Sequence, residues 1–291
     1  MTKEKVPGRV FRPARSDAAS AAGSTPLPQT THPAYRLAFQ DNDFLLRDDL
    51  RPVRFQLELL KAQTLLDEAQ VHSTFVFYGS ARIPEAVKAE AIVAAATTDT
   101  QRRIALRLQD KARYYEEARK LARLASREPI NADGSRDFVV CSGGGPSIME
   151  AANRGADDVG AESVGLNIVL EHEPLPNEYV TPRLSLNFHY FALRKMHFLL
   201  RARAVAVFPG GFGTFDELFE LLTLIQTGKM AQLPIVLFGK TFWNRVVDFD
   251  ALVEEGVISP NDLNLFHFVE TAEEAWAIVQ DFYRPKLREA S

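Results

Sequence analysis

One stretch of the chain places a carboxylate close behind a glycine-rich turn. It reads Pro209-Gly210-Gly211-Phe212-Gly213-Thr214-Phe215-Asp216-Glu217. The apolar run 204–208 before it predicts a buried strand, and apolar residues spaced by three and four after it predict a helix. A glycine-rich turn that opens a helix presents backbone N–H groups and the positive end of the helix dipole to an anion such as phosphate. Glu217 lies one turn inside that helix, within reach of a sugar attached to the phosphate.

A simpler interpretation of the same residues is a capping box. Thr214 and Glu217 have the T-x-x-E spacing in which both side chains bond to the backbone at a helix start. One glycine would be enough to make the turn, however, and this stretch contains three. We therefore favour a phosphate or nucleotide site.

Two other predicted strands end in turns of small residues. Ser80 follows the strand 73–78, and the glycine-rich turn 142–147 follows the strand 138–141. The second turn matches neither G-x-G-x-x-G nor a P-loop, so close packing of helix on sheet is the alternative interpretation. Because the carboxyl ends of parallel strands meet at one edge of a sheet, we predict a single nucleotide cleft shared by these turns.

The helix predicted over 188–203 carries two adjacent cations, Arg194 and Lys195. Such residues are usually surface charges, but apolar side chains surround these two on nearly every side of the helix. A charge on a buried helix needs a partner or a ligand. His189 and His197 are eight positions apart, which is not a metal-binding spacing, and there is no cysteine cluster. We expect neither a metal nor a cofactor.

The P-G-G-x-G-T-x-x-E stretch, preceded by Arg194-Lys195, resembles the signatures of the Lonely Guy family, whose members are often labelled lysine decarboxylases. The resemblance covers roughly residues 75–239. It implies hydrolysis of the N-glycosidic bond of a purine nucleoside 5′-monophosphate, with release of the base and ribose 5-phosphate. AMP and N6-modified AMP, including a cytokinin riboside monophosphate, are the implied substrates. It also implies a homodimer or a higher homo-oligomer.

The resemblance assigns roles to particular residues. Glu217 is the implied catalytic carboxylate for the positive charge that develops on the ribose. Arg194 is the second catalytic residue, which would anchor the substrate and hold Glu217 ionised. A proline-rich loop over 171–183 supplies a substrate-contacting glutamate in relatives. The predicted substrate-binding residues are Ser80, Gly144, Gly145, Met149, Glu178, Lys195, Gly210, Gly211, Phe212, Gly213, Thr214 and Thr223.

Two other activities are open to a chain with this pattern. Molybdenum-cofactor carriers resemble the same family and bind a phosphate-bearing pterin without hydrolysing it, so a non-catalytic carrier is the main alternative. Arg194 and Glu217 at the family's spacing favour the enzyme. An amino-acid decarboxylase would need pyridoxal phosphate on a lysine, and no lysine here has a convincing Schiff-base context.

The composition excludes several broad classes. Of the 291 residues 46% are hydrophobic, and the net charge of −4 gives no electrostatic case for nucleic-acid or membrane binding. No apolar run reaches about 18 residues, and the N-terminus lacks the apolar region of a signal peptide. The only cysteine, Cys141, fits a reducing, cytoplasmic setting.

Strands alternate with helices from residue 75 onward, which predicts an α/β fold with a doubly wound, Rossmann-like parallel sheet. Residues 1–45 are expected to form a disordered or loosely docked tail, with an organelle transit peptide as the alternative. Residues 46–72 supply an N-terminal helix, and 73–291 form one nucleotide-binding domain. The segment 85–127 is predicted to be helical in two pieces, with a break near 97–100. A further helix is predicted over 241–254.

Overall fold

The computed structural model describes residues 11–171 and 175–289, with side chains as far as residue 284. The chain divides into two units, Met1–Glu58 and Leu59–Ser291. The sheet and all candidate site residues belong to the second unit. None of the described helices is long and apolar enough to cross a membrane.

In the described part of the first unit, residues 11–58, the helices form no core. No residue of α1, α2, α3 or of the 3-10 turns η1 to η3 is buried. The first ten residues of the predicted tail lie outside the described part of the chain. The elements are α1 (Ala14–Ala22), α2 (Pro28–Thr31), η1 (Pro33–Tyr35), η2 (Ala38–Gln40), α3 (Asn42–Leu45), η3 (Asp48–Leu50) and the start of α4 (Arg51–Glu68).

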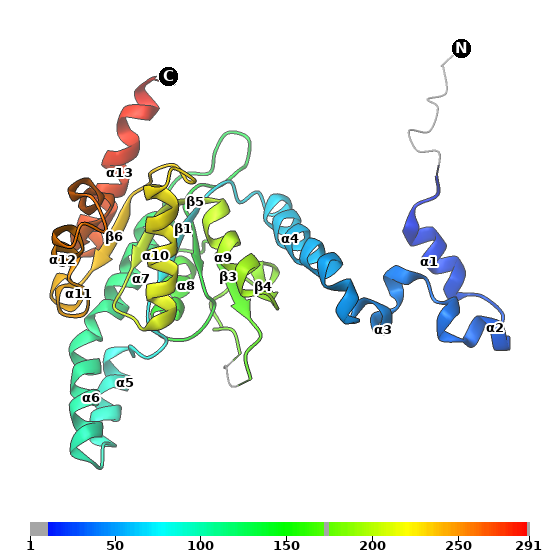
Figure 1. The fold of residues 1–291 in the computed structure, drawn as a ribbon, viewed down its shortest axis with the longest axis horizontal. Helices are drawn as coiled ribbons and strands as arrows, with labels where there is room; N and C mark the ends of the chain where they lie inside the picture. The colour runs from blue at the N-terminus through cyan, green and yellow to red at the C-terminus, as the bar shows by residue number, and fades with distance from the viewer. Residues whose placement is uncertain (1–10, 172–174, 290–291) are drawn as a thin grey trace. The chain divides into compact units, whose positions relative to one another are not determined.

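The second unit alternates strands with helices, as the sequence pattern predicts (Figure 1). After α4 its elements are β1 (Thr74–Tyr78), α5 (Ala86–Ala94), α6 (Asp99–Lys111), α7 (Arg113–Ala125), β2 (Val139–Ser142), α8 (Ile148–Asp157), β3 (Val164–Ile168), η4 (Pro182–Leu184), β4 (Ser185–Phe188), α9 (Phe191–Leu200), β5 (Ala202–Val207), α10 (Phe212–Gln226), β6 (Ile235–Phe238), α11 (Lys240–Val246), α12 (Phe249–Glu254), η5 (Pro260–Leu265), β7 (His267–Val269) and α13 (Ala272–Glu289).

The seven strands among the described residues form one parallel sheet in the order β4-β3-β2-β1-β5-β6-β7. The doubly wound α/β fold is therefore confirmed. Every residue of β1, β2 and β6 is buried, as expected for strands covered by helices on both faces. The order reverses around β1, so the carboxyl ends of β1, β2 and β5 meet at the switch point where such folds bind ligands.

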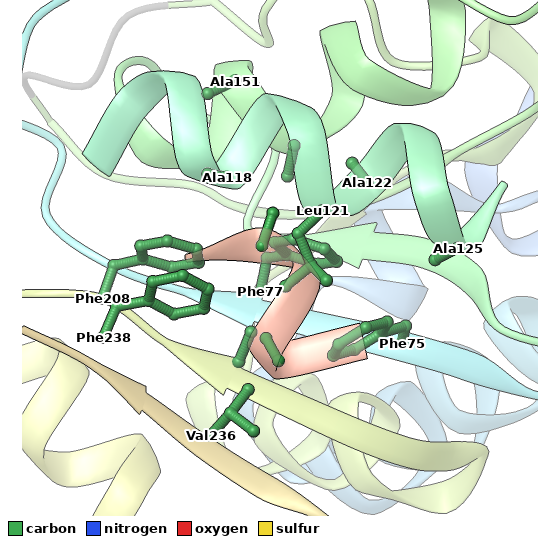
Figure 2. Close-up of a cluster of buried hydrophobic side chains, with 14 of the residues drawn as sticks. Phe75, Phe77, Ala118, Leu121, Ala122, Ala125, Ala151, Phe208, Val236 and Phe238 are labelled. Atoms are coloured by element: carbon green, nitrogen blue, oxygen red, sulfur yellow. The ribbon is translucent and has the colours of Figure 1, made fainter. Parts of the chain in front are cut away.

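The main hydrophobic core lies between the sheet and the layer formed by α7, α8 and α13. Figure 2 shows Phe75 and Phe77 of β1 facing the small side chains of α7, such as Ala118 and Ala122. Phe208 and Phe238 stack beside them, with ring centroids 4.2 Å apart. Ion pairs connect helices α9 and α10 to each other.

Three helix boundaries differ from the prediction. The segment 85–127 contains three helices, because α6 ends and α7 begins on either side of Ala112. The helix predicted from Phe188 starts at Phe191, since Phe188 pairs with Ile168 in the sheet. The helix predicted over 241–254 is split into α11 and α12, where the Asp248 side chain caps the second helix.

Candidate active site

The turns after β1, β2 and β5 are in contact at the carboxyl edge of the sheet. The Ser80 N–H donates to the carbonyl of Pro209, 3.2 Å away, which ties the first turn to the signature turn. The Ile148 N–H makes a long contact of 3.5 Å with the Ser80 carbonyl, which ties the start of α8 to the same turn. The structure thus brings together the three turns that the sequence predicted to share a cleft.

The signature stretch opens α10 without a side-chain cap. The helix begins at Phe212 with Gly211 as its N-cap, so Thr214 stands at the third helical position and Glu217 at the sixth. The capping-box interpretation is therefore wrong. Thr214 is buried and packs against Gly210, where an added Cβ would lie 2.2 Å from its Oγ1. Gly210 is needed for this close approach. Packing within the protein does not explain the other two glycines, Gly211 and Gly213.

The space in front of α10 is open. A Cβ added at Gly211 or Gly213 would meet no heavy atom within 4 Å. The N–H groups of Phe212, Gly213 and Thr214 donate to no acceptor among the residues that the structure describes. Phe212 itself is 98% exposed. The mouth of α10 therefore has both the room and the free donors that an anion requires.

Arg194 of α9 lies next to Glu217 of α10. One guanidinium nitrogen, Nη1, is 4.0 Å from Glu217 Oε1, and the two side chains are 13% and 16% exposed. The Arg194 Nε donates to the carbonyl of Leu166 over 2.6 Å, and its guanidinium lies 5.2 Å from the centre of the Phe198 ring. Arg194 is thus held from two sides, and its Nη1 lies towards the carboxylate.

Burial raises the pKa of Glu217 to about 7. Arg194 lowers this pKa, but the prediction that it holds Glu217 ionised is wrong, because burial raises the pKa by more and Asp216 raises it further. The loss of water around the carboxylate outweighs the nearby cation because the two side chains are too far apart for a hydrogen bond. A carboxyl group whose pKa is near neutrality is suited to exchange protons with a substrate.

Lys195 points to two other carboxylates on α10. Its Nζ lies 2.9 Å from Asp216 Oδ1 and 3.1 Å from Glu220 Oε2. These ion pairs fasten α9 to α10 and so fix the separation of Arg194 from Glu217. The predicted substrate contact by Lys195 stays a prediction.

The glycine-rich turn after β2 is closely packed, as the alternative interpretation expected. Gly144 has a φ of +74°, and a Cβ there would lie 2.2 Å from the side chain of Asn167. The Asn177 amide donates to the carbonyls of Gly144 and Gly145, at 3.0 Å and 2.9 Å. This turn is therefore rigid, and its carbonyls are already paired within the protein.

The same turn also leaves space for the Arg194 side chain, because Gly143 has no Cβ. A Cβ on Gly143 would lie 2.7 Å from Arg194 Nη2 and 2.7 Å from the sulfur of Met149. Met149 thus lies beside Arg194, and its predicted contact with the substrate stays a prediction. Gly143 was not predicted as a site residue, although its place in a run of three glycines was a usable signal.

Two predicted substrate contacts are exposed side chains. Glu178 is exposed in the loop before β4. Thr223 is also exposed, and its hydroxyl donates to the Phe219 carbonyl over 2.7 Å. Ten residues of helix separate it from Gly213, which amounts to about 15 Å along the axis. Both residues stay predictions.

Ser147 adopts a backbone conformation that serine rarely tolerates. It is the N-cap of α8 with φ 65° and ψ −120°, and its hydroxyl makes no capping bond. Backbone strain of this kind is concentrated at functional sites. This strain was not predictable from the local residues, because serine is an ordinary N-cap residue.

Part of this chain is similar to known proteins. The family model described as "Possible lysine decarboxylase" matches residues 149–279. The cytokinin riboside 5′-monophosphate phosphoribohydrolase LOG3 of Arabidopsis thaliana is 28% identical over 139 residues, which are 47% of this chain and 63% of that protein. The resemblance to the Lonely Guy family is confirmed.

Other similar proteins are more distant or only partly covered. The pyrimidine/purine nucleotide 5′-monophosphate nucleosidase of Escherichia coli K12 is 29% identical over 46% of this chain and 31% of its own length. The chain thus spans less than two thirds of LOG3 and under a third of the nucleosidase. A molybdenum cofactor carrier protein of Chlamydomonas reinhardtii has a TM-score of 0.38 at 19% identity, over 58% of this chain and 87% of that one. The fold assignment rests on the strand order, not on this likeness.

Replacing Glu217 by glutamine is expected to stabilise the protein at pH 8. The folded-state pKa of about 7 lies above the ordinary Glu value of 4.5, which applies in the unfolded chain. The stability of the wild-type protein therefore falls as the pH rises from about 4.5 to about 7. Glutamine mimics the protonated form, so the gain is on the order of 3 kcal/mol at pH 8 and disappears near pH 4.5. Thermal melts at both pH values measure it.

The matched control is Glu162→Gln. Arg183 and Arg136 lower the pKa of Glu162, so its replacement should cost stability at pH 8. A Glu217→Gln variant that is less stable than wild type at pH 8 would contradict the account of its burial.

Ser147→Gly is expected to stabilise the fold by about 1 kcal/mol. Relief of strain contributes about 1–3 kcal/mol, and the added freedom of the unfolded chain takes back about 0.4–1 kcal/mol. Thermal or denaturant unfolding measures the change. Ser126→Gly is the control, since Ser126 has an ordinary φ of −73° at the end of α7. There the same replacement should destabilise the protein. A loss of stability in Ser147→Gly would show that the turn is not strained.

Proposed function

We propose that this protein hydrolyses the N-glycosidic bond of nucleoside 5′-monophosphates to release the free base and ribose 5-phosphate. One observation carries the proposal: a half-buried carboxylate with a pKa of about 7, paired with an arginine, lies one turn inside an open, glycine-lined helix mouth. The names of the similar proteins, phosphoribohydrolases and a nucleotide nucleosidase, support the same reaction class.

The substrate phosphate would bind at the mouth of α10. The free N–H groups of Phe212, Gly213 and Thr214 supply its hydrogen bonds, and the helix dipole adds favourable charge. Glu217 lies four residues further along the helix than Gly213, or about 6 Å. That separation suits the link between a 5′-phosphate and the ribose ring. Arg194 then supports the substrate from α9.

The chemistry follows from the charge that develops on the ribose. As the bond from C1′ to the base nitrogen breaks, positive charge builds on the ring, and the Glu217 carboxylate stabilises it. The same carboxylate takes a proton from the water that adds to C1′, and the departing base takes up a proton. The water oxygen becomes the C1 hydroxyl of ribose 5-phosphate. Only ionised Glu217 can do this, so activity is lost as the pH falls below about 7.

The preferred base is a purine in this proposal, with AMP or an N6-modified AMP as substrate. The support is the name of LOG3, a cytokinin riboside 5′-monophosphate phosphoribohydrolase, and that of LOGL3 from Oryza sativa, which is named a "probable" enzyme of the same kind. Turnover of AMP, GMP and isopentenyl-AMP, compared at equal concentration, separates the possibilities. Equal or faster turnover of plain AMP removes the cytokinin-specific version and leaves the reaction class intact.

Wild-type protein is expected to release adenine and ribose 5-phosphate from AMP in equal amounts. The kcat/KM should fall towards tenfold per pH unit below about pH 7, and Glu217→Gln should reduce turnover by about 10²-fold or more. Product release measured by chromatography from pH 5 to 9 tests both. Glu162→Gln serves as control, since this carboxylate is also half-buried and paired with arginine but lies outside the site.

Absence of turnover on every monophosphate would overturn the proposal. If a nucleotide nevertheless raised the melting temperature, the non-catalytic carrier would be the better interpretation. If Glu217→Gln kept wild-type activity, the reaction would have to use another group.

A further inference from the structure

Tyr78 lies on the face of β1 that is turned towards the candidate site. Alternate residues of a strand point to opposite faces, and Phe75 and Phe77 point into the core with α7, α8 and α13. Tyr78 therefore faces the opposite layer (Figure 2 shows the core side). Its ring meets Phe198 of α9 edge-on, with centroids 5.1 Å apart. Sequence reasoning missed Tyr78, since it reads as the last residue of a buried strand.

Tyr78 belongs to the same cluster as the two candidate catalytic residues. Phe198 has Tyr78 on one side and the Arg194 guanidinium on the other, 5.2 Å from its ring centre. Arg194 in turn lies 4.0 Å from Glu217. Burial raises the pKa of Tyr78 well above its usual value, and the negative charge of Glu217 raises it further. The phenol therefore lies within the field of the catalytic carboxylate.

The cluster contains a donor and an acceptor that are both unpaired. Tyr78 is only 3% exposed, and its hydroxyl has no hydrogen-bond partner among the described residues. Among the same residues Glu217 accepts no hydrogen bond, since Arg194 lies too far away. Neither the Tyr78 hydroxyl nor a Glu217 oxygen is among the fully buried side-chain atoms that lack a hydrogen-bond partner, so each keeps some exposure to solvent and is available for a new hydrogen bond.

We propose that the Tyr78 hydroxyl is a positioning group that donates a hydrogen bond to the Glu217 carboxylate when a nucleotide occupies the site. The bond would fix the orientation of the carboxylate towards C1′ and favour its ionised form. Tyr78 acts on the reaction through Glu217 and does not touch the substrate. This inference rests on the proposed function and deepens it.

Other charged groups also act on this pair and are unchanged by the test. Arg194 and Lys195 on α9 lower the pKa of Glu217, and Asp216 and Glu220 on its own helix raise it. The buried thiol of Cys141 on β2 lies in the same field. All five of these groups stay in place when Tyr78 loses its hydroxyl. A change in the pKa of Glu217 therefore reports the loss of the hydrogen bond from Tyr78.

Tyr78→Phe should move the acid limb of kcat upward by about one pH unit. Removal of a donor disfavours the ionised carboxylate, so its pKa rises, and kcat reports groups in the substrate complex. We expect about a tenfold loss of kcat at pH 6, little change at pH 9, and an unchanged KM. Tyr115→Phe is the matched control: its hydroxyl donates to Glu150 over 2.7 Å, away from Glu217, and its loss should leave the limb in place.

A second measurement reads the carboxylate without turnover. The ¹³C NMR signal of the Glu217 side chain, assigned by its absence in Glu217→Gln, can be titrated with AMP or ribose 5-phosphate bound. A higher pKa in Tyr78→Phe than in wild type supports the inference even if the protein proves inactive. Coincident titrations, or an acid limb that stays in place in an active Tyr78→Phe variant, would overturn it while leaving the proposed hydrolysis untouched.

Discussion

The candidate site depends on Glu217 being shielded from water while its carboxylate lies close to the Arg194 cation. Its carboxyl group has lost most of its water, and Arg194 lies near enough to temper that loss without forming a hydrogen bond. The result is a pKa of about 7, at which the group can hold or release a proton at neutral pH. A closer ion pair would have kept the carboxylate permanently ionised, and an isolated burial would have kept it protonated.

The fold holds this balance in place. The strand order reverses at β1, so three turns and the starts of two helices meet at one edge of the sheet. Lys195 fastens α9 to α10, and Gly143 leaves the space that the Arg194 side chain occupies. The mouth of α10 then lies one turn from Glu217 with its donors free. Each feature helps to set the Glu217 carboxylate at a fixed distance from the mouth of α10, where we propose that phosphate binds.

Features that arise from short stretches of sequence were predictable. Features that depend on how distant segments pack together, or on the path of the chain, were not. The parallel sheet, the signature turn and the Arg194–Glu217 pair follow from apolar runs and a short motif. Tyr78 was missed because its significance comes from strand alternation against a distant helix. The helix break at Ala112 lacks the glycine or proline that usually marks one. The strain at Ser147 arises from the path of the chain between β2 and α8, which no local pattern reveals.

The most direct test of the account compares AMP with adenosine as substrates for the wild-type protein. If the mouth of α10 holds the 5′-phosphate while Glu217 acts on the ribose, kcat/KM for AMP should exceed that for adenosine by about 10²-fold or more, since remote binding energy is used to position the reacting bond. Equal values for the two substrates would show that the glycine-lined mouth does not bind phosphate. That result would contradict the central claim that one helix start serves both to anchor the phosphate and to position the catalytic carboxylate.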